Sequence, residues 1–227
     1  MRERPILFSA PMVRALLAGT KTQTRRVVKH RWPYLWGPNY YPSGKVLTDL
    51  PNQPGAFMEF RSHVQDTPGY EGSPSPYLVP CPYGAPGDRL WVRETWQAVN
   101  GTDRARHIVT HPRPNVGWLE YAATPRLDEP AYKWRPSIHM PRWACRLVLE
   151  ITGVRVERLQ QITEADAGAE GCAPSWLDAD DNETVHAHAQ PTYCQGFARL
   201  WRDINGPDSW GANPWVWVVE FRRVEGV

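Results

Sequence analysis

The segment Gly19–Arg26 holds the residues whose types and spacing are best suited to chemistry. It contains the run Lys-Thr-Gln-Thr-Arg-Arg from Lys21 onward. A hydroxyl such as that of Thr24 is a weak nucleophile until a base takes its proton, and a desolvated lysine can be that base. The planar guanidinium of Arg26 suits a phosphate or a carboxylate. The alternative is a solvated strand with threonines chosen for β propensity and cations that face water. The pattern alone favours this alternative.

Two carboxylates could complete a site with these residues. Glu94 lies at the end of a predicted strand, between Arg93 and Trp96. That position suits either the edge of a binding site or a buried ion pair. Glu170 lies in the last turn of a predicted helix, where the macrodipole disfavours a negative charge. A carboxylate against the dipole indicates a functional residue, but exposed glutamates are also common there, so neither position decides alone.

Metal-ligating side chains are scattered along the chain. His186, His188 and Cys194 form one candidate ligand set, and His107 with His111 forms another at i, i+4 spacing. Both sets lie in polar loops without a second clustered pair. We therefore predict no metal site, and we expect no cofactor.

Local patterns predict the elements that hold the Lys21 segment. Ile6–Phe8 is typical of a short strand, and Ser9 and Pro11 are typical of the start of the helix that follows. Gly19 is a suitable stop for that helix. The Lys21 segment is then expected to leave the helix end as an extended strand.

The alternation of a strand divides the segment between two faces. Thr22, Thr24 and Arg26 are expected on one face. Lys21 and Arg25 are expected on the other face. A turn or bulge could bring Lys21 and Thr24 to the same side, but the sequence does not indicate one.

The rest of the chain is predicted to alternate short elements with long loops. The expected elements are strands at Arg89–Trp96, Arg142–Leu159 (one bent or two short) and Asn213–Phe221, a helix from the Thr163 capping box to Gly171, and an amphipathic helix over Phe197–Ile204. Residues of about 32–86 and 100–141 are predicted to be loop-rich insertions, with a strand or two at Phe57–His63. This order predicts a single α+β domain over residues 1–227, built around a small β-barrel with flanking short helices.

Composition limits the partners and the location. The net charge of +2 over 227 residues is too small to predict wrapping of duplex DNA. It suits a small ligand, a nucleoside or a short single strand better. No stretch approaches the length of a membrane-spanning helix, and the first residues lack an apolar signal region. We therefore expect a cytoplasmic protein with no membrane partner.

Four separated segments together resemble the ASCH family of PUA-like domains, particularly its longer, tryptophan-rich versions common in phages and prophages. They are Gly19–Arg26 (Gly-x-Lys-Thr-x-Thr-x-Arg), Gly87–Trp96, Ile162–Gly171 and Asn213–Phe221. The resemblance implies a PUA-like fold, with a cleft that accommodates nucleotides or RNA.

Within that family, a small bacterial enzyme hydrolyses the N4-acetyl amide of acetylcytidine, and its Lys-Thr-x-Thr-x-Arg run matches Lys21–Arg26. The resemblance implies that Lys21 and Thr24 are catalytic. The enzyme's glutamate lies in a helix that opens with Leu-Thr-Glu, and the same offset here falls on Glu170. Lys21 would then be the general base, Thr24 the nucleophile or a water-positioning hydroxyl, and Glu170 a proton shuttle to the leaving amine. Glu170 could instead activate water directly.

The remaining expected site residues would bind the substrate or nucleic acid. They are Thr22, Arg25, Arg26, Arg93, Glu94, Trp96 and Trp215. The expected function is a metal-independent amidohydrolase acting on N4-acetylcytidine or a related modified nucleoside. The alternatives are a non-catalytic module that binds single-stranded RNA or nucleotides, and a phage accessory protein whose fold serves protein contacts. The chain is much longer than the minimal enzyme, and similarity of fold does not settle function.

Overall fold

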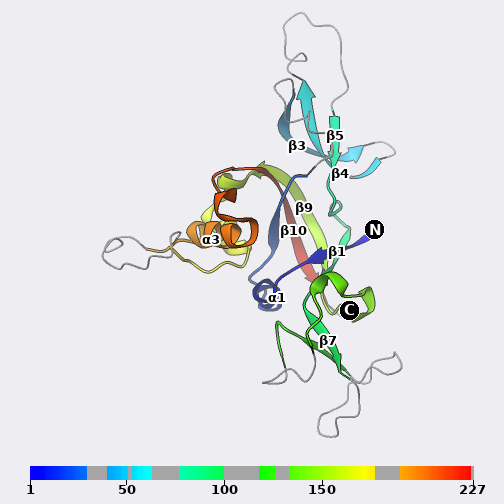
Figure 1. The fold of residues 1–227 in the computed structure, drawn as a ribbon. Helices are drawn as coiled ribbons and strands as arrows, with labels where there is room; N and C mark the ends of the chain where they lie inside the picture. The colour runs from blue at the N-terminus through cyan, green and yellow to red at the C-terminus, as the bar shows by residue number, and fades with distance from the viewer. Residues whose placement is uncertain are drawn as a thin grey trace, which may run out of the picture.

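A central five-stranded sheet organises the molecule (Figure 1). A computed structural model of the chain describes residues 1–29, 40–50, 53–62, 77–99, 118–125, 133–176 and 190–225. In spatial order the strands of the sheet are β1 (Glu3–Leu7), β6 (Arg89–Arg93), β9 (Val148–Arg158), β10 (Trp215–Val224) and β2 (Gln23–Val27). β1 and β6 are parallel, and the other neighbours are antiparallel. β2 is therefore an edge strand beside β10.

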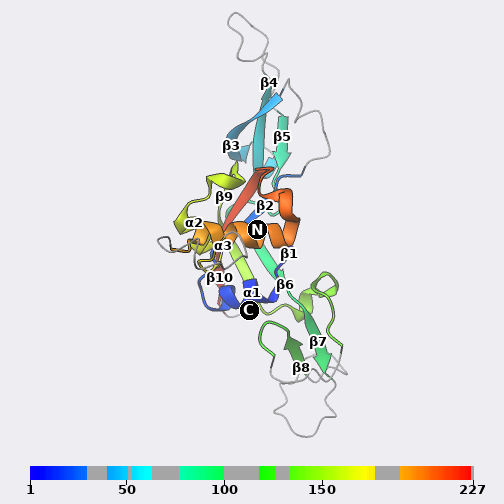
Figure 2. The same ribbon diagram turned by 60° about the vertical axis from the view of Figure 1, so that its left-hand side comes forward.

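Two smaller antiparallel sheets flank the central one, toward its opposite ends (Figure 2). The first contains β3 (Tyr40–Leu50), β4 (Gln53–Ser62) and β5 (Tyr77–Pro80), and the second pairs β7 (Trp96–Val99) with β8 (Trp118–Tyr121). The predicted α+β class is confirmed. Over the described residues these sheets do not join into a closed barrel, so the predicted small barrel is not confirmed.

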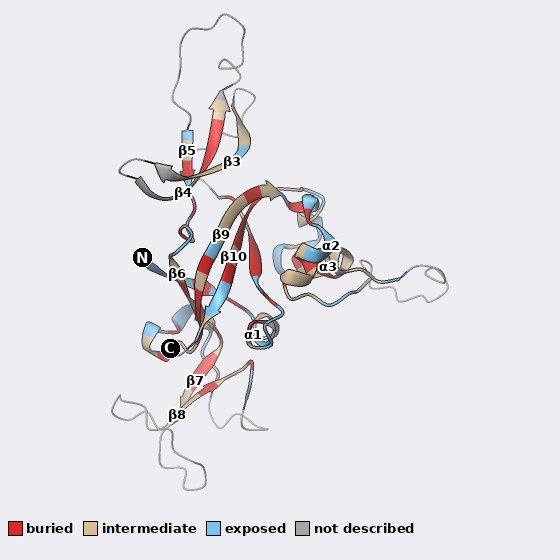
Figure 3. Ribbon diagram, turned by 180° about the vertical axis from the view of Figure 1, so that it is seen from behind, coloured by how far each residue is buried: buried red, intermediate tan, exposed pale blue. Residues whose placement is uncertain are grey.

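The apolar run in β10 reflects burial of both strand faces. Trp217 and Val219 pack into one hydrophobic cluster with β1, β6, β9 and α1. Val216 and Val218 pack into a second cluster with the other two helices. Since successive side chains point to opposite faces, a strand between two cores must be apolar at every position. Figure 3 shows the resulting line of buried residues along β10.

The helices follow their sequence signals. α1 (Ala10–Leu17) begins after Ser9 with a proline in its first turn, as predicted. α2 (Glu164–Ala169) begins after Thr163, whose Oγ1 accepts a hydrogen bond of 3.1 Å from the backbone of Asp166. This side-chain cap satisfies one of the N–H groups that a helix start leaves free.

α3 (Tyr193–Asn205) lies over the β10 side of the sheet (Figure 2). Phe197 and Trp201 are buried in the cluster that contains Val216 and Val218, which confirms the predicted amphipathic helix. Single 3₁₀ turns lie at Ser137–His139, Arg142–Ala144, Leu159–Gln161 and Pro207–Ser209. Among the described residues, no helix has the length and apolar character needed to cross a membrane.

Three predicted elements differ from the structure. The strand expected over Arg89–Trp96 ends at Arg93, and Trp96 begins β7 in another sheet. The strand expected from Arg142 begins at Val148 because a 3₁₀ turn comes first. The first insertion contains β3 and β5 as well as β4, the strand expected near Phe57; His63 lies outside the described residues.

Candidate functional site

The turn after α1 brings Lys21 against the C-terminal end of α2. Gly19 has a left-handed backbone (φ +75°), which turns the chain out of the helix. Lys21 then pairs with Glu170 in an isolated antiparallel bridge. Gly171 is also left-handed (φ +79°), and a Cβ there would lie 2.7 Å from Cβ of Ala15 and 3.0 Å from Cβ of Lys21. Only glycine fits this close approach without displacement.

The amino group of Lys21 is held by Glu170. Nζ donates to Oε2 at 2.9 Å and to the backbone carbonyl at 2.8 Å. The Lys21 side chain has no exposed area, and that of Glu170 is 4% exposed. Nζ also lies 5.4 Å from the ring centre of Phe8. The two donated bonds leave one position on the nitrogen, which carries a proton in the ammonium and a lone pair in the neutral amine.

Burial lowers the pKa of Lys21 below its ordinary value. Loss of hydration is the largest cause, and the positive charge of Arg26 acts in the same direction. The charge and the hydrogen bond of Glu170 oppose this shift. A lowered pKa increases the neutral fraction of a lysine, and only the neutral amine can accept a proton.

Arg25 holds the other oxygen of Glu170. Its Nη1 lies 3.2 Å from Oε1 of Glu170, and its Nη2 lies 3.3 Å from Oδ2 of Asp166. Nε donates to Oε1 of Glu157 at 3.0 Å, and Nη2 contacts the same oxygen. The side chain has no exposed area. The guanidinium thus binds three carboxylates of the protein.

A second ring of polar contacts supports these carboxylates. Arg155 lies 3.2 Å from Glu157 and 3.0 Å from Asp166, and it also pairs with Glu220. Gln23 donates to Oδ1 of Asp166 at 3.1 Å. Burial alone would raise the pKa of Asp166, but the bond from Gln23 and the charges of the two arginines outweigh it and lower that pKa.

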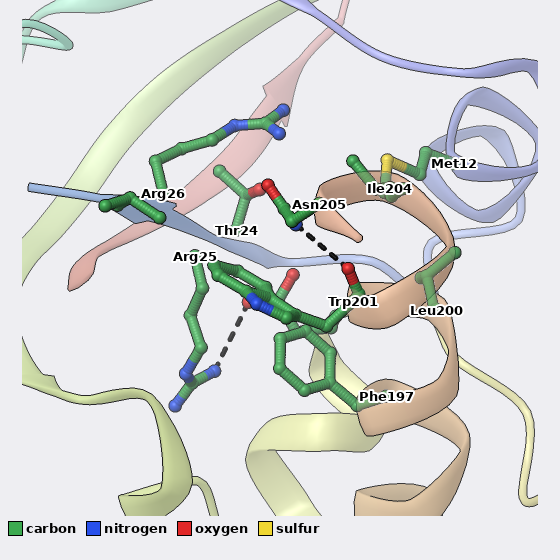
Figure 4. Close-up of a pocket in the computed structure, with 11 residues that line it drawn as sticks. Met12, Thr24, Arg25, Arg26, Phe197, Leu200, Trp201, Ile204 and Asn205 are labelled. Carbon is green, nitrogen blue, oxygen red and sulfur yellow. Dashed lines mark hydrogen bonds and ion pairs between the residues drawn. The ribbon is translucent and has the colours of Figure 1, made fainter. Parts of the chain in front are cut away.

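A pocket with about 410 Å³ of space, open to solvent, lies beside Glu170 (Figure 4). Its polar wall comes from β2 and Glu170, and its apolar wall comes mainly from α3. The lining residues are Met12, Thr24, Arg25, Arg26, Val27, Glu170, Phe197, Leu200, Trp201, Ile204 and Asn205. Small-molecule sites commonly combine apolar walls with a few polar groups.

The pocket brings together some of the predicted catalytic residues. Thr24 is buried and lines it together with Glu170. Lys21 is buried and does not line the pocket. Glu170 contacts Nζ of Lys21 and lines the pocket, so it connects Lys21 to the pocket. Arg26 is half-buried beside them and donates to the backbone carbonyl of Leu7 at 2.8 Å. The structure therefore clusters Lys21, Thr24, Glu170 and Arg26 from segments almost 150 residues apart in sequence.

The predicted residues of the Arg93 segment lie in other surroundings. Glu94 is 1% exposed and accepts two bonds of 2.8 Å from Arg146, which is the buried ion pair considered as its alternative. Trp96 is buried in a separate hydrophobic cluster. Arg93 donates to the backbone carbonyl of Ile138. These three predicted binding residues are not among those that line the pocket.

Thr22 and Trp215 also lie outside the pocket lining. Thr22 is exposed, and its backbone bonds to Ala169 and Phe221. Trp215 packs partly against the larger hydrophobic core, and the guanidinium of Arg158 lies 4.8 Å from its ring centre.

Sequence reasoning missed the contribution of α3 to the pocket. The stripe that contains Phe197 and Trp201 indicated a helix face that packs on the core, and both side chains are indeed buried. The same stripe continues into Leu200 and Ile204 at the pocket, and Ile204 is 53% exposed. A helical period identifies the apolar face but does not show which part of it remains uncovered.

Among the described residues, no group of three or more histidine, cysteine or acidic side chains is arranged to hold a metal ion. The predicted candidates His107, His111, His186 and His188 lie outside the described residues.

Comparison of the chain with models of protein families, with curated proteins and with solved structures finds no match.

Proposed function

We propose that the pocket is the active site of a metal-independent amidohydrolase that acts on N4-acetylcytidine or a related modified nucleoside. The observation that carries the proposal is the buried contact of 2.9 Å between Lys21 and Glu170 beside a pocket that Thr24 also lines. A desolvated amine, a carboxylate and a hydroxyl are the groups that general base and nucleophilic catalysis require. The resemblance to ASCH domains, and to their PUA-like barrel, supplies the substrate class.

The reaction consumes one water for each amide bond that breaks. The oxygen of water, or the hydroxyl of Thr24 in a first step, attacks the acetyl carbonyl. Glu170 takes the proton of the attacking group. The neutral amine of Lys21 accepts that proton when its lone pair, rather than an N–H group, faces Oε2. The proton then passes to the nitrogen that leaves. With water as the attacking group, the products are acetate and the free exocyclic amine. With Thr24 as the attacking group, the amine leaves first, and water then hydrolyses the acetyl ester on Thr24, which releases acetate and restores the hydroxyl. Each oxygen of Glu170 has two lone pairs, and one contact with a cation leaves room for the proton.

The pocket walls suit an acylated nucleobase. The aromatic and aliphatic side chains of α3 offer an apolar surface to a planar base and its acetyl group. Arg26 offers a cation, and a guanidinium can bind a carbonyl or a phosphate oxygen.

The second candidate function is a module that binds RNA or nucleotides without catalysis. It is favoured by the covered position of Lys21, whose two bonds to Glu170 are those of a structural ion pair. On this proposal the pocket and Arg26 still bind the nucleotide or RNA, but no bond is broken.

Incubation of the purified protein with N4-acetylcytidine, followed by chromatography for cytidine, tests the leading proposal. Thr24→Ala and Lys21→Met are each expected to reduce turnover by about 100-fold or more. Thr20→Ala is the matched control for Thr24→Ala, because its exposed hydroxyl bonds only to the backbone of Ala15 among the contacts of the described chain. That control is expected to keep wild-type turnover.

Lack of turnover by the wild type would refute the enzyme for this substrate. Salt-dependent binding of single-stranded RNA that Arg26→Ala weakens would then support the binding module. Equal losses in Thr24→Ala and Thr20→Ala would contradict the role assigned to Thr24.

A further inference from the structure

Arg25 occupies a central place among the charges below the pocket. It lies between β9, which carries Glu157, and α2, which carries Asp166 and is followed by Glu170. Its five N–H groups are fixed in one plane, so a single side chain can reach all three carboxylates at once. A lysine at this position has no such fork.

Lys21 and Arg25 each contact one oxygen of the Glu170 carboxylate. Lys21 contacts Oε2 at 2.9 Å, and Arg25 contacts Oε1 at 3.2 Å. All three side chains are at least 96% buried, so water screens these charges weakly. A change at one oxygen therefore alters the electrostatic interaction at the other.

We infer that Arg25 is a positioning residue that shares the Glu170 carboxylate with Lys21 and thereby limits how strongly that carboxylate holds the Lys21 ammonium. The geometry carries this inference: one buried carboxylate, two buried cations, and one oxygen for each. Its consequence for catalysis rests on the proposed function, but its consequence for Lys21 does not.

The other charged groups near Lys21 and Arg25 determine which variant can serve as a control. Glu170, Arg26 and the thiol of Cys172 act on the pKa of Lys21, after the larger effect of burial. Glu157, in contrast, contacts Arg25 and forms no hydrogen bond or ion pair with Glu170 or Lys21 among the described side chains.

Around Arg25, the facing groups are the three carboxylates and, from α3, Cys194, whose thiol is influenced by the arginine charge. The ring of Phe197 lies 5.9 Å from its guanidinium carbon. Loss of the Arg25 charge removes a cation near Lys21. It also leaves Lys21 as the cation that contacts the Glu170 carboxylate. Both effects favour the ammonium, so the pKa of Lys21 should rise.

The test is an NMR titration of protein that contains ¹³C-labelled lysine. The chain has four lysines, and Lys21→Met assigns the signal of Lys21. In Arg25→Met we expect the pKa of Lys21 to rise by about one unit, and in Arg25→Lys by about half a unit. Glu157→Gln is the matched control: it also removes a partner from the Arg25 network, but it keeps both cations on Glu170, so the pKa of Lys21 should stay within about 0.2 units of the wild type.

Thermal melts of each variant show that it is folded before it is titrated, and Arg25→Lys carries the test if Arg25→Met does not fold. If the pKa of Lys21 is unchanged in a folded Arg25 variant, or rises as much in Glu157→Gln, the inference is wrong. If the protein turns over N4-acetylcytidine, the acidic limb of the kcat profile should move to higher pH by the same amount in the Arg25 variants, with KM changed less than twofold. A pKa rise without any turnover supports the role of Arg25 and refutes only the proposed function.

Discussion

Replacing Glu170 with glutamine tests whether its charge holds the site together. The carboxylate lies 2.9 Å from Nζ of Lys21 and 3.2 Å from Nη1 of Arg25. At an effective dielectric constant of about 20, each attraction is about 5–6 kcal/mol. The cost of burying the charges offsets much of this, and removal of one member of a buried pair typically costs about 3–5 kcal/mol. We expect Glu170→Gln to lower the free energy of unfolding by about that amount at pH 7.

The loss should depend on pH in one direction. The charge of Glu170 raises the pKa of Lys21, so that pKa, already lowered by burial, falls further in the variant. Below the variant's value both proteins bury the ammonium, and the difference in stability is largest. As the pH rises from the variant's pKa to the wild-type pKa, the variant loses its proton first and the difference shrinks. The change is about 1.4 kcal/mol for each unit that separates the two pKa values.

Urea denaturation at pH 6, 7.5 and 9, followed by tryptophan fluorescence, measures this difference. Glu150→Gln provides the matched control, because Glu150 pairs at 2.9 Å with an Arg222 side chain that is 70% exposed. Exposed pairs contribute about 0–1 kcal/mol, so the control should change little at any pH. A loss below about 1 kcal/mol in Glu170→Gln, or a loss that grows with pH, would refute the reasoning.

The remaining predictions concern the turn beside Lys21 and the neighbouring thiol. Gly171→Ala adds a Cβ 2.7 Å from Cβ of Ala15 to a left-handed backbone, and urea denaturation should show a loss of about 2–4 kcal/mol. Gly19→Ala is equally left-handed but has no atom within 4 Å of its new Cβ, so it should lose only about 1–2 kcal/mol; equal losses would contradict the role of the close approach. Burial, followed by the charge of the nearby carboxylate, raises the pKa of Cys172 to about 11. Mass spectrometry should therefore show alkylation by iodoacetamide at pH 8 about 100-fold slower than for an exposed thiol, with the rate rising up to about pH 11, and a rate like that of glutathione would contradict it.

Much of the fold could be predicted because its signals are local. The cap at Thr163 lies within one turn of a helix and the apolar stripe of α3 within about two turns, and both predictions were confirmed. The end of β6 at Arg93 could not be seen in this way. Glu94 leaves the strand to pair with Arg146, 52 residues away, and no local pattern of alternation shows that partner.

The carboxylate partners of Arg25 could not be predicted for the same reason. In the sequence it is one of two adjacent arginines, and either could have faced solvent or a ligand. Its three carboxylate partners come from β9 and from the region of α2, more than 130 residues away. Its neighbour Arg26 instead donates a hydrogen bond to a backbone carbonyl of β1 and is half-buried at the pocket. The sequence shows the charge of both residues. Tertiary contacts decide that Arg25 binds three carboxylates of the protein, whereas Arg26 binds a backbone carbonyl; both line the pocket.

The position of β2 at the edge of the sheet resolves the conflict between strand alternation and a shared site. Alternation placed Lys21 and Arg25 on one face, and both do contact Glu170. It placed Thr24 on the opposite face, yet Thr24 and Arg25 line the same pocket. A pocket beside an edge strand can receive side chains from both faces, because among the described residues no further strand pairs with β2 on that side. Strand alternation therefore places Lys21 and Thr24 on different faces. Glu170, the residue that follows α2, contacts Lys21 and lines the pocket together with Thr24, so it connects the two residues at the edge of the sheet.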